Sequence, residues 1–440
     1  SVFIVLGWIV LAGRLIQVQG TQRDALSASV TRQSTFQEPI PARPGEILDR
    51  HGHVLAMTIA RESLYAVPSQ IEDPWQFSWK VSQTLGLNAD SIYERITDPA
   101  TPHFAWIQRR LSDEQAAAVR RLELPSQCYG FRNEYMRQYP QGAFAAHVLG
   151  IRDIDNSGRG GLEESLNSMI CGEDGIRLLT RDARGVVMEV AAEQSRPPQH
   201  GRTVISTLDL LIQIETERQL DRLVERWRPQ GACAIVIDPA SGEVLAMASR
   251  PTFDPGHLTH VPDGGWNNLA VSAVFEPGST FKPLVVAWAV QKQMLQQDEM
   301  IDCHWGAYRM GRRVLHDHHA YGELSVEDVL VKSSNIGMAR IAERMGLQEL
   351  YRATVSFGFG RRTGIELPGE AGGLLRPLAR WDDYSLGSVP MGQELAVTPL
   401  QLIAAHAALA NGGRLVRPHI LAAENDPVPS PLFSVNSVNA

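Results

Sequence analysis

Ser279 and Lys282 stand three residues apart and are the pair in this sequence whose types and spacing could do chemistry. Pro277 and Gly278 interrupt whatever precedes them, and the apolar run at residues 284–290 is typical of a buried helix. We therefore expect Ser279 at or near a helix N-terminus, with Lys282 one turn further along the same face. This arrangement puts an amine within reach of a hydroxyl.

The chemistry open to such a pair is nucleophilic catalysis. A serine hydroxyl is a weak nucleophile at neutral pH until a base takes its proton. A lysine can be that base only if burial and positive potential pull its pKa down from about 10.4. A helix N-terminus supplies positive potential and free backbone N–H groups that could hold an oxyanion. The S-x-x-K pattern alone is weak because chance copies are common, so the surrounding sequence has to decide.

Length and composition describe a folded protein with more than one domain. The 440 residues leave room for two domains and a short extra element, at about 100–200 residues per domain. Apolar residues make up 44% and charged residues 20%, which is typical of globular chains. The net charge of −8, without a long basic run, argues against nucleic acid as a partner. The four cysteines are scattered, so neither a disulfide framework nor a zinc ribbon is implied, and no cofactor is expected.

The first residues favour a membrane anchor. Residues 2–13 form an apolar run that is short for a membrane span, which needs about 20 apolar residues, and Arg14 interrupts it. A buried helix or a signal-peptide core is the alternative. Because the chain opens on Ser1 and not on methionine, we expect residues 1–19 to be part of a single N-terminal anchor, with the rest outside the cytoplasm.

The stretch before residue 200 predicts short strands and helices. Turn signals at residues 44–45 and 51–52 favour strand, turn, strand. Residues 70–125 look helical, with breaks at Pro74, Pro99 and Pro102. Ser112 is a plausible start for one helix because Gln115 follows three residues later. Residues 195–201, with two prolines, are predicted to be a linker.

The second half of the chain predicts an α+β domain with an antiparallel sheet. A strand at residues 203–208 leads into an amphipathic helix over about 209–228, and two apolar strands at 232–237 and 243–248 flank a turn and form a hairpin. The helix that carries Ser279 follows. The order strand, helix, hairpin, helix indicates an α+β domain. Capping residues predict later helix starts at Ser325 and Thr398, and stop signals predict helix ends at Gly346 and Asn411.

A second motif, Ser333-Ser334-Asn335, begins 54 residues after Ser279. The two motifs together resemble the first two active-site motifs of the penicillin-binding protein superfamily. Other segments are similar to those of class B penicillin-binding proteins: residues 42–56, 137–150 and 161–167 to their pedestal domain, and residues 276–278, 357–360, 367–370 and 397–401 to their transpeptidase domain. The resemblance spans roughly residues 40–413, and the agreement of so many ordered segments makes it specific.

The resemblance implies a cell-wall enzyme in the cytoplasmic membrane, with its catalytic domain outside the cytoplasm. Residues 20–200 correspond to a dimerisation-type pedestal domain, and residues 201–440 to a transpeptidase domain that has helices on both faces of its sheet. Such enzymes cross-link peptidoglycan stem peptides and are acylated by β-lactams. Asn335 and the compact pedestal favour the division branch over the elongation branch, which implies a glycan-polymerising membrane protein and other division proteins as partners.

The resemblance also assigns roles to four residues. Ser279 attacks the penultimate D-alanine carbonyl of a stem peptide and forms an acyl-enzyme, which an amine of a neighbouring stem peptide resolves. Lys282 is the general base towards Ser279. Ser333 relays a proton between Lys282 and the leaving or attacking nitrogen, and Asn335 hydrogen-bonds Lys282 and the substrate amide, so Ser279, Ser333 and Asn335 also bind substrate. By itself, the Ser/Asn cluster could equally be a helix cap.

The family's third motif, K-[ST]-G, is absent from these residues. No lysine follows Lys332, and the Arg-Thr-Gly triplet at residues 362–364 comes too early. We expect the 440 residues to end before this motif and its strands, so that they would not turn over substrate by themselves. Natural loss of the motif in a catalytically dead or penicillin-sensing scaffold is the alternative.

Two further alternatives concern the class of enzyme and a metal. A serine β-lactamase or DD-carboxypeptidase shares the serine, the lysine and the second motif, but it does not need the segments before residue 200. Residues 302–304 (Asp-Cys-His) and 316–319 (His-Asp-His-His) bring zinc-type ligands together between the two motifs. Because no ligand spacing repeats, a polar loop is the preferred interpretation and no metal site is predicted.

Overall fold

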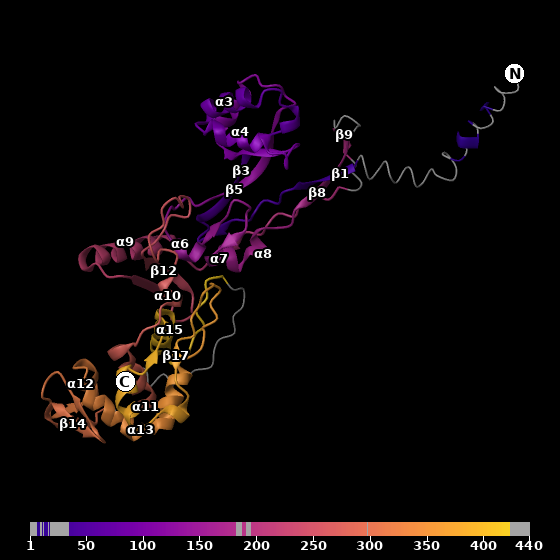
Figure 1. The fold of residues 1–440 in the computed structure, drawn as a ribbon. Helices are drawn as coiled ribbons and strands as arrows, with labels where there is room; N and C mark the ends of the chain where they lie inside the picture. The colour runs from indigo at the N-terminus through magenta and orange to yellow at the C-terminus, as the bar shows by residue number, and fades with distance from the viewer. Residues whose placement is uncertain are drawn as a thin grey trace. The chain divides into compact units, whose positions relative to one another are not determined.

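The computed structural model describes residues 35–181, 187–190, 195–296 and 298–422, and a few positions between residues 7 and 17. The chain divides into two compact units that interleave along the sequence (Figure 1). Unit 1 consists of Ser1–Gly45, Thr58–Met136 and Ser168–Arg202, and unit 2 of Glu46–Met57, Arg137–Asn167 and Thr203–Ala440. The domain boundaries expected from the sequence, at residues 19 and 200, stay a prediction.

The expected N-terminal anchor, residues 1–19, lies mostly outside the described residues. Among the helices that the structure does describe, none is both long and apolar enough to cross a membrane.

Unit 1 combines helices with antiparallel strands. Its main elements are β3 (Val54–Ala66), α3 (Pro74–Leu85), α4 (Ala89–Thr97), β4 (Ala105–Leu111), α5 (Asp113–Arg120) and β5 (Tyr129–Gln138). Strand β3 pairs with β4 and β5, while α4 and α5 contact β4. Buried side chains that include Leu64, Val81 and Ile107 give these elements a common core.

Strand β4 corrects the helical interpretation of residues 70–125. The segment from Ala105 to Leu111 is extended and pairs antiparallel with β3, and Ala105 and Ile107 are buried on one side of it. Two prolines, Pro99 and Pro102, follow the preceding helix, and after them burial alternates along the strand, with Ala105 and Ile107 buried and Trp106 and Gln108 partly exposed. The predicted helix start at Ser112 is confirmed, because its side chain and that of Gln115 form a capping box.

The predicted linker at residues 195–201 is hydrogen-bonded to its surroundings in unit 1. The N–H and the carbonyl of Arg196 bond to the backbone of Ile176, both at 2.8 Å, and Gln199 exchanges two bonds of the same length with Glu173. Ile176 belongs to β8 (Gly175–Arg181), which pairs with β1 (Thr35–Ile40). The segment therefore lies along a strand and is not a free connection.

Unit 2 combines a two-stranded hairpin with long helices. Its main elements are α9 (Leu210–Trp227), β11 (Ala232–Ile237), β12 (Val244–Arg250), α10 (Leu269–Ser272), α11 (Lys282–Gln291), α12 (Val326–Val331), α13 (Asn335–Ser356) and α15 (Pro399–Ala410). Strands β11 and β12 pair antiparallel, α9 contacts both strands, and α10 and α15 contact β11. The mixture of helices with antiparallel strands confirms the predicted α+β class.

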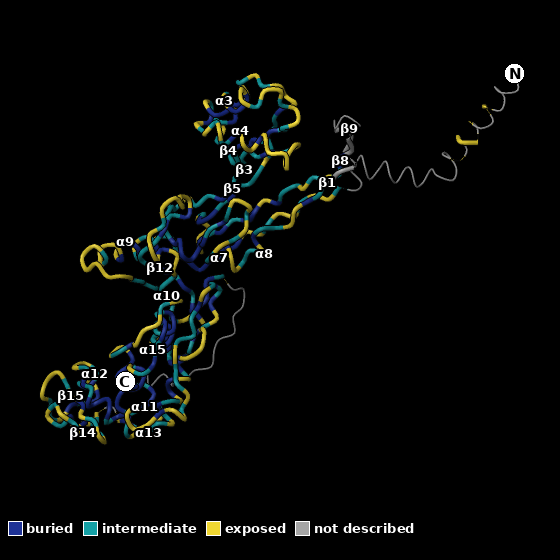
Figure 2. The backbone as a smooth tube through the Cα atoms, viewed as in Figure 1, coloured by how far each residue is buried: buried dark blue, intermediate teal, exposed yellow. Residues whose placement is uncertain are grey.

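Helices α11 and α13 contact each other and form the centre of the larger core (Figure 2). Leu284 and Val285 of α11 and Ile336 and Met338 of α13 are fully or almost fully buried. Between Leu284 and Val290, helix α11 is apolar on all sides, as expected of a helix inside a core. The predicted buried helix at residues 284–290 is thus confirmed.

The two capping residues predicted for unit 2 begin their helices as expected: the side chains of Ser325 and Thr398 accept a backbone N–H from the first turn of α12 and α15, respectively. Asp209, for which no cap was predicted, does the same for α9. Gly346 breaks the helical backbone with φ of 70° and ψ of 165°, although a second helical stretch follows it within α13.

Two segments that resemble pedestal sequences meet within unit 2 through buried charges. Glu163 is fully buried, and its carboxylate accepts a hydrogen bond from Arg137 at 2.6 Å and forms an ion pair with Arg152 at 3.0 Å. Asn167 accepts further bonds from the Arg152 guanidinium at 2.7 and 3.2 Å. Because both arginines share one carboxylate away from water, this cluster fixes residues 137–167 as a single piece.

Candidate active site

Ser279 lies in the short 3-10 helix η4 (Gly278–Phe281), which runs directly into α11. Gly278 takes a positive φ of 58°, and Pro283 occupies the first turn of α11, where its missing N–H costs nothing. Phe281 packs into the core and is only 2% exposed. The prediction that Ser279 stands at a helix N-terminus is confirmed.

A distant glycine holds the backbone just before Ser279. The Gly278 N–H donates to the Gly392 carbonyl at 3.0 Å. Gly392 has a φ of 76°, and a Cβ atom added there would lie 2.1 Å from the Gly278 carbonyl oxygen. Phe275 and Val397 also exchange two backbone hydrogen bonds, of 3.0 and 2.9 Å. The segment that leads into Ser279 is therefore fixed against residues 392–397, and only glycine fits at position 392.

Lys282 is buried, with 2% exposure, and its ammonium group has three acceptors. Nζ donates to the carbonyl oxygen of Ser333 at 2.7 Å, to Oγ of Ser333 at 2.9 Å, and to Oδ1 of Asn335 at 3.0 Å. Burial lowers the pKa of Lys282 to about 8, although the nearby carboxylate of Asp317 acts in the opposite direction. At pH 7, an amine with a pKa of about 8 is about one-tenth neutral, which makes it usable as a base.

Ser333 connects Lys282 to Ser279. Its Oγ lies 3.0 Å from Oγ of Ser279 and 2.9 Å from Nζ of Lys282. Ser333 lies between α12 and α13 with a φ of 53°, and this left-handed backbone lets its hydroxyl and its carbonyl bind the same ammonium. Lys282 thus reaches Ser279 through Ser333. The structure brings all four residues singled out in the sequence into one hydrogen-bonded chain.

Asp317 holds the second motif in place. Its Oδ1 accepts the backbone N–H groups of Asn335 at 2.5 Å and Ile336 at 3.0 Å, and its Oδ2 accepts the Ser334 hydroxyl at 2.6 Å. These N–H groups belong to the first turn of α13, where the helix offers them no acceptor. The Asn335 side-chain amide also donates to the His316 carbonyl at 3.2 Å. Sequence reasoning missed this role, since no local signal shows that a cap comes from 18 residues upstream.

The zinc-type residues between the two motifs have other contacts. Cys303 is buried, burial raises the pKa of its thiol, and its Sγ lies 3.4 Å from the Ser334 hydroxyl. The His304 ring stacks on Tyr308 with 4.6 Å between centroids. Within the described parts of the chain, no group of three or more His, Cys, Asp or Glu side chains is placed to hold a metal ion.

Two family profiles match the chain. Residues 232–439 match the penicillin binding protein transpeptidase domain, and residues 39–206 match the penicillin-binding protein dimerisation domain. The first match contains η4, α11 and the second motif, and therefore all four residues of the hydrogen-bonded chain.

Individual relatives agree with these matches. Peptidoglycan D,D-transpeptidase FtsI of Escherichia coli K12 is 30% identical over 431 residues, which cover 97% of this chain and 72% of the relative. Stage V sporulation protein D of Bacillus subtilis is 33% identical over 430 residues, which cover 97% of this chain and 66% of the relative. The chain thus spans about two thirds of the length of such curated relatives.

Solved structures show the same fold. The structure of penicillin binding protein 3 from Mycobacterium tuberculosis, complexed with aztreonam, has a TM-score of 0.67 and 27% identity, and the match covers 91% of this chain and 73% of that chain. Both domain profiles match this chain, and they match in order. The fold is shared with the solved structure, and the relative FtsI is 30% identical over nearly the whole chain. The chain belongs to the class B penicillin-binding proteins, which join a dimerisation domain to a transpeptidase domain.

Proposed function

We propose that this protein is a serine D,D-transpeptidase that cross-links peptidoglycan stem peptides through an acyl-enzyme at Ser279, and that β-lactams acylate the same serine. The observation that carries the proposal is the hydrogen-bonded chain from Lys282 Nζ through Ser333 Oγ to Ser279 Oγ, with steps of 2.9 and 3.0 Å. Relatives named peptidoglycan D,D-transpeptidase and a relative complexed with aztreonam support it.

Acylation begins with the loss of the Ser279 proton. As Oγ of Ser279 attacks the carbonyl carbon of the penultimate D-alanine, its proton passes to Oγ of Ser333, which gives its own proton to the neutral amine of Lys282. The Ser333 hydroxyl must point towards Lys282 in this step, which a rotation about one bond allows. The ammonium with three acceptors is therefore the state that exists after the proton has been taken up.

The fold also offers stabilisation for the charge that develops on the substrate oxygen. Ser279 lies in the first turn of η4, where a backbone N–H has no acceptor within the helix and can donate to an oxyanion. Lys282 then returns its proton through Ser333 to the nitrogen of the leaving D-alanine. The amine of a second stem peptide repeats the sequence in reverse, and the Asn335 side chain hydrogen-bonds the substrate amide.

The rate of acylation should depend on pH through Lys282. The base is the neutral amine, so the rate is expected to rise with pH, pass its midpoint near the Lys282 pKa of about 8, and level off above it. The measurement is the second-order rate constant for acylation by nitrocefin from about pH 6 to about pH 10. A rate that is flat over this range, or that falls as pH rises through 8, would contradict a neutral Lys282 base.

Location and partners follow from the same proposal. We infer a protein anchored in the cytoplasmic membrane through residues 1–19, with its catalytic domain outside the cytoplasm. The apolar run at residues 2–13 supports the anchor. Asn335 in the second motif favours the division branch, with a glycan-polymerising membrane protein and other division proteins as partners.

The test is to find the atom that β-lactams modify and the reaction that stem peptides undergo. The full gene product is labelled with fluorescent penicillin, digested and analysed by mass spectrometry, and we expect one adduct in the peptide that contains Ser279. With a pentapeptide donor and an amine acceptor, we expect release of D-alanine together with a cross-linked product. An adduct on another residue, or a folded protein that is never labelled, would support the scaffold alternative. Release of D-alanine without cross-linking would indicate a carboxypeptidase.

A further inference from the structure

Unit 2 contains a cavity of about 320 Å³ that the proposed acyl transfer does not use. Three segments line it, within residues 146–161, 253–272 and 367–369. The first lies in the part of the chain that matches the dimerisation profile, and the other two lie in the part that matches the transpeptidase profile. All three belong to unit 2, so the cavity is formed within one compact unit.

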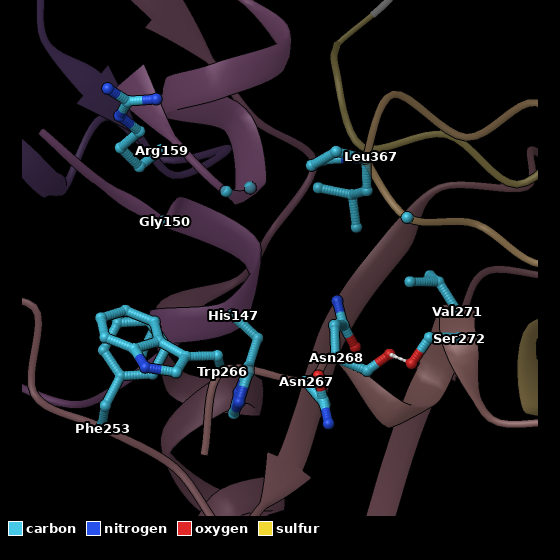
Figure 3. A pocket seen from close by; sticks show the side chains of 15 residues that line it. His147, Gly150, Arg159, Phe253, Trp266, Asn267, Asn268, Val271, Ser272 and Leu367 are labelled. Carbon is cyan, nitrogen blue, oxygen red and sulfur yellow. Dashed lines mark hydrogen bonds between the residues drawn. The ribbon is translucent and has the colours of Figure 1, made fainter. Parts of the chain in front are cut away.

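Aromatic rings form one wall of the cavity. Phe253 is 5% exposed, and His147 packs edge-on against it with 5.4 Å between centroids. Trp266 lies against Phe253 at 4.6 Å, yet 54% of Trp266 remains exposed. Figure 3 shows the rings of Phe253 and Trp266 together, with His147 beside them and Leu367 across the cavity. A large exposed ring that is backed by buried rings is a rigid platform open to a ligand.

Hydrogen bonds hold the loop that carries this platform. His147 Nε2 lies 2.7 Å from the Gly265 carbonyl oxygen. The Asn267 N–H donates to the Gly264 carbonyl at 3.0 Å, and the Asn268 side chain accepts the Ala270 N–H at the start of α10. Burial lowers the pKa of His147, so its ring is neutral at pH 7 and its Nε2–H donates to the carbonyl. A platform fixed in this way loses little freedom when a ligand binds.

Polar groups around the platform have hydrogen-bonding capacity to spare. In the described parts of the chain, no hydrogen-bond partner is found for the Asn267 side-chain amide or for the Trp266 indole N–H. Arg159 lines the opposite side of the cavity (Figure 3). Its guanidinium is 68% exposed and pairs with Asp153 at 3.3 Å, so part of its charge is already compensated. The cavity therefore offers donors and an acceptor, but little net charge.

We propose that this cavity is a carbohydrate-binding subsite that holds an N-acetylated amino sugar of the peptidoglycan strand. A pyranose ring presents an apolar C–H face and a rim of polar groups, which fit the exposed face of Trp266 and the free amide of Asn267, respectively. The Arg159 guanidinium can donate to a hydroxyl or an acetamido oxygen. A charged peptide terminus fits less well, because the one cation that lines the cavity already has a carboxylate partner. The choice of peptidoglycan among carbohydrates rests on the proposed transpeptidase function.

The chain limits how far the cavity can lie from Ser279. Ser272 lines the cavity, and Ser279 stands seven positions after it in the chain. Since an extended chain spans at most about 3.6 Å per residue, the two Cα atoms are no more than about 25 Å apart. A stem peptide of five residues spans up to about 18 Å by the same measure. A stem peptide on a sugar held in the cavity can therefore cover most of the largest possible distance to the nucleophile.

The test measures carbohydrate binding to the full gene product with two probes, chitotetraose and peptidoglycan strands from which an amidase has removed the stem peptides. Binding is followed by saturation-transfer NMR and calorimetry. Trp266→Ala is expected to raise the Kd about tenfold, which corresponds to about 1.4 kcal/mol, and Trp266→Phe to restore part of the affinity because it keeps an aromatic face. Asn267→Ala is expected to weaken binding by a smaller factor. The matched control is Trp227→Ala, which removes a tryptophan that is 69% exposed on α9 and outside the cavity.

Each variant is also labelled with fluorescent penicillin, which shows that it is folded and separates the two proposals. Normal labelling with weakened carbohydrate binding in Trp266→Ala supports the subsite. Equal binding by Trp266→Ala and the unmodified protein, or no binding of either probe at about 5 mM, overturns it. Trp266-dependent binding of a stem peptide without sugar also overturns it in favour of a peptide site. If the unmodified protein binds carbohydrate through Trp266 but is never labelled, the transpeptidase proposal fails and the subsite stands.

Discussion

Replacing Ser279 with alanine is expected to abolish covalent labelling by β-lactams, with acylation at least ~10⁴-fold slower than in the unmodified protein. The reason is that the substitution removes the oxygen that lies in the first turn of η4 and ends the hydrogen-bonded chain from Lys282. Ser333 cannot replace it, because Ser333 lies outside η4 and so away from the free N–H of its first turn. The measurement is fluorescent-penicillin labelling followed over hours.

The substitution should leave the fold intact. Apart from its bond to Ser333, the Ser279 side chain has no polar partner in the described residues, so the thermal midpoint should change by no more than about 2 °C. Ser241→Ala, in the exposed turn between β11 and β12, is the control that removes a serine hydroxyl away from the site. Undiminished labelling of a folded Ser279→Ala protein would mean that another residue is the nucleophile.

Replacing Lys282 with methionine is expected to slow acylation by about 10³-fold and to remove the rise in rate around pH 8. Methionine has nearly the shape of lysine but cannot take a proton, so Ser279 would lose its route to a base while the packing of α11 persists. The two acceptors of Ser333 and the Asn335 carbonyl would lose their donor, at a cost of about 1–3 kcal/mol of stability. Stopped-flow acylation at several pH values and thermal unfolding measure the two effects separately.

Lys292→Met is the matched control for this prediction. Lys292 is exposed and directly follows the last residue of α11, and its ammonium lies over the Trp288 ring at 5.1 Å. Its loss should leave the acylation rate within about twofold, since an exposed cation–π contact contributes about 0.5–1 kcal/mol to stability and nothing to the proton route. A Lys282→Met protein that keeps both its rate and its pH dependence would rule out Lys282 as the base.

Local signals were enough to predict the elements on which the nucleophile depends. Pro277 and Gly278 marked the start of η4, and the apolar run behind Lys282 marked α11, because both effects act within one turn of helix. The capping box of Thr398 and Gln401 fixed the start of α15 for the same reason. Lys282 and Ser333 are far apart in sequence and come together because α11 contacts α13 in the core. Only the family resemblance implied that these two residues meet.

Features that depend on long-range contacts could not be predicted in this way. Strand β4 was interpreted as helix because its pairing with β3, about 45 residues away, outweighs the local preference of a short segment. Asp317 was considered only as a metal ligand, although its carboxylate caps α13 from a separate loop. The carbohydrate-binding cavity joins segments from residue 146 to residue 369, so no window of sequence contains its pattern.

The contact between Gly392 and Gly278 has a consequence for how variation in this protein would be interpreted. Neither glycine supplies a reactive group, yet any side chain at position 392 would push against the backbone that carries Ser279. In a library of all single substitutions selected by growth, position 392 would therefore tolerate about as little as the nucleophile itself. Intolerance to substitution would then identify both the residues that react and the residues that only position them. Selection by growth alone would not distinguish these two groups.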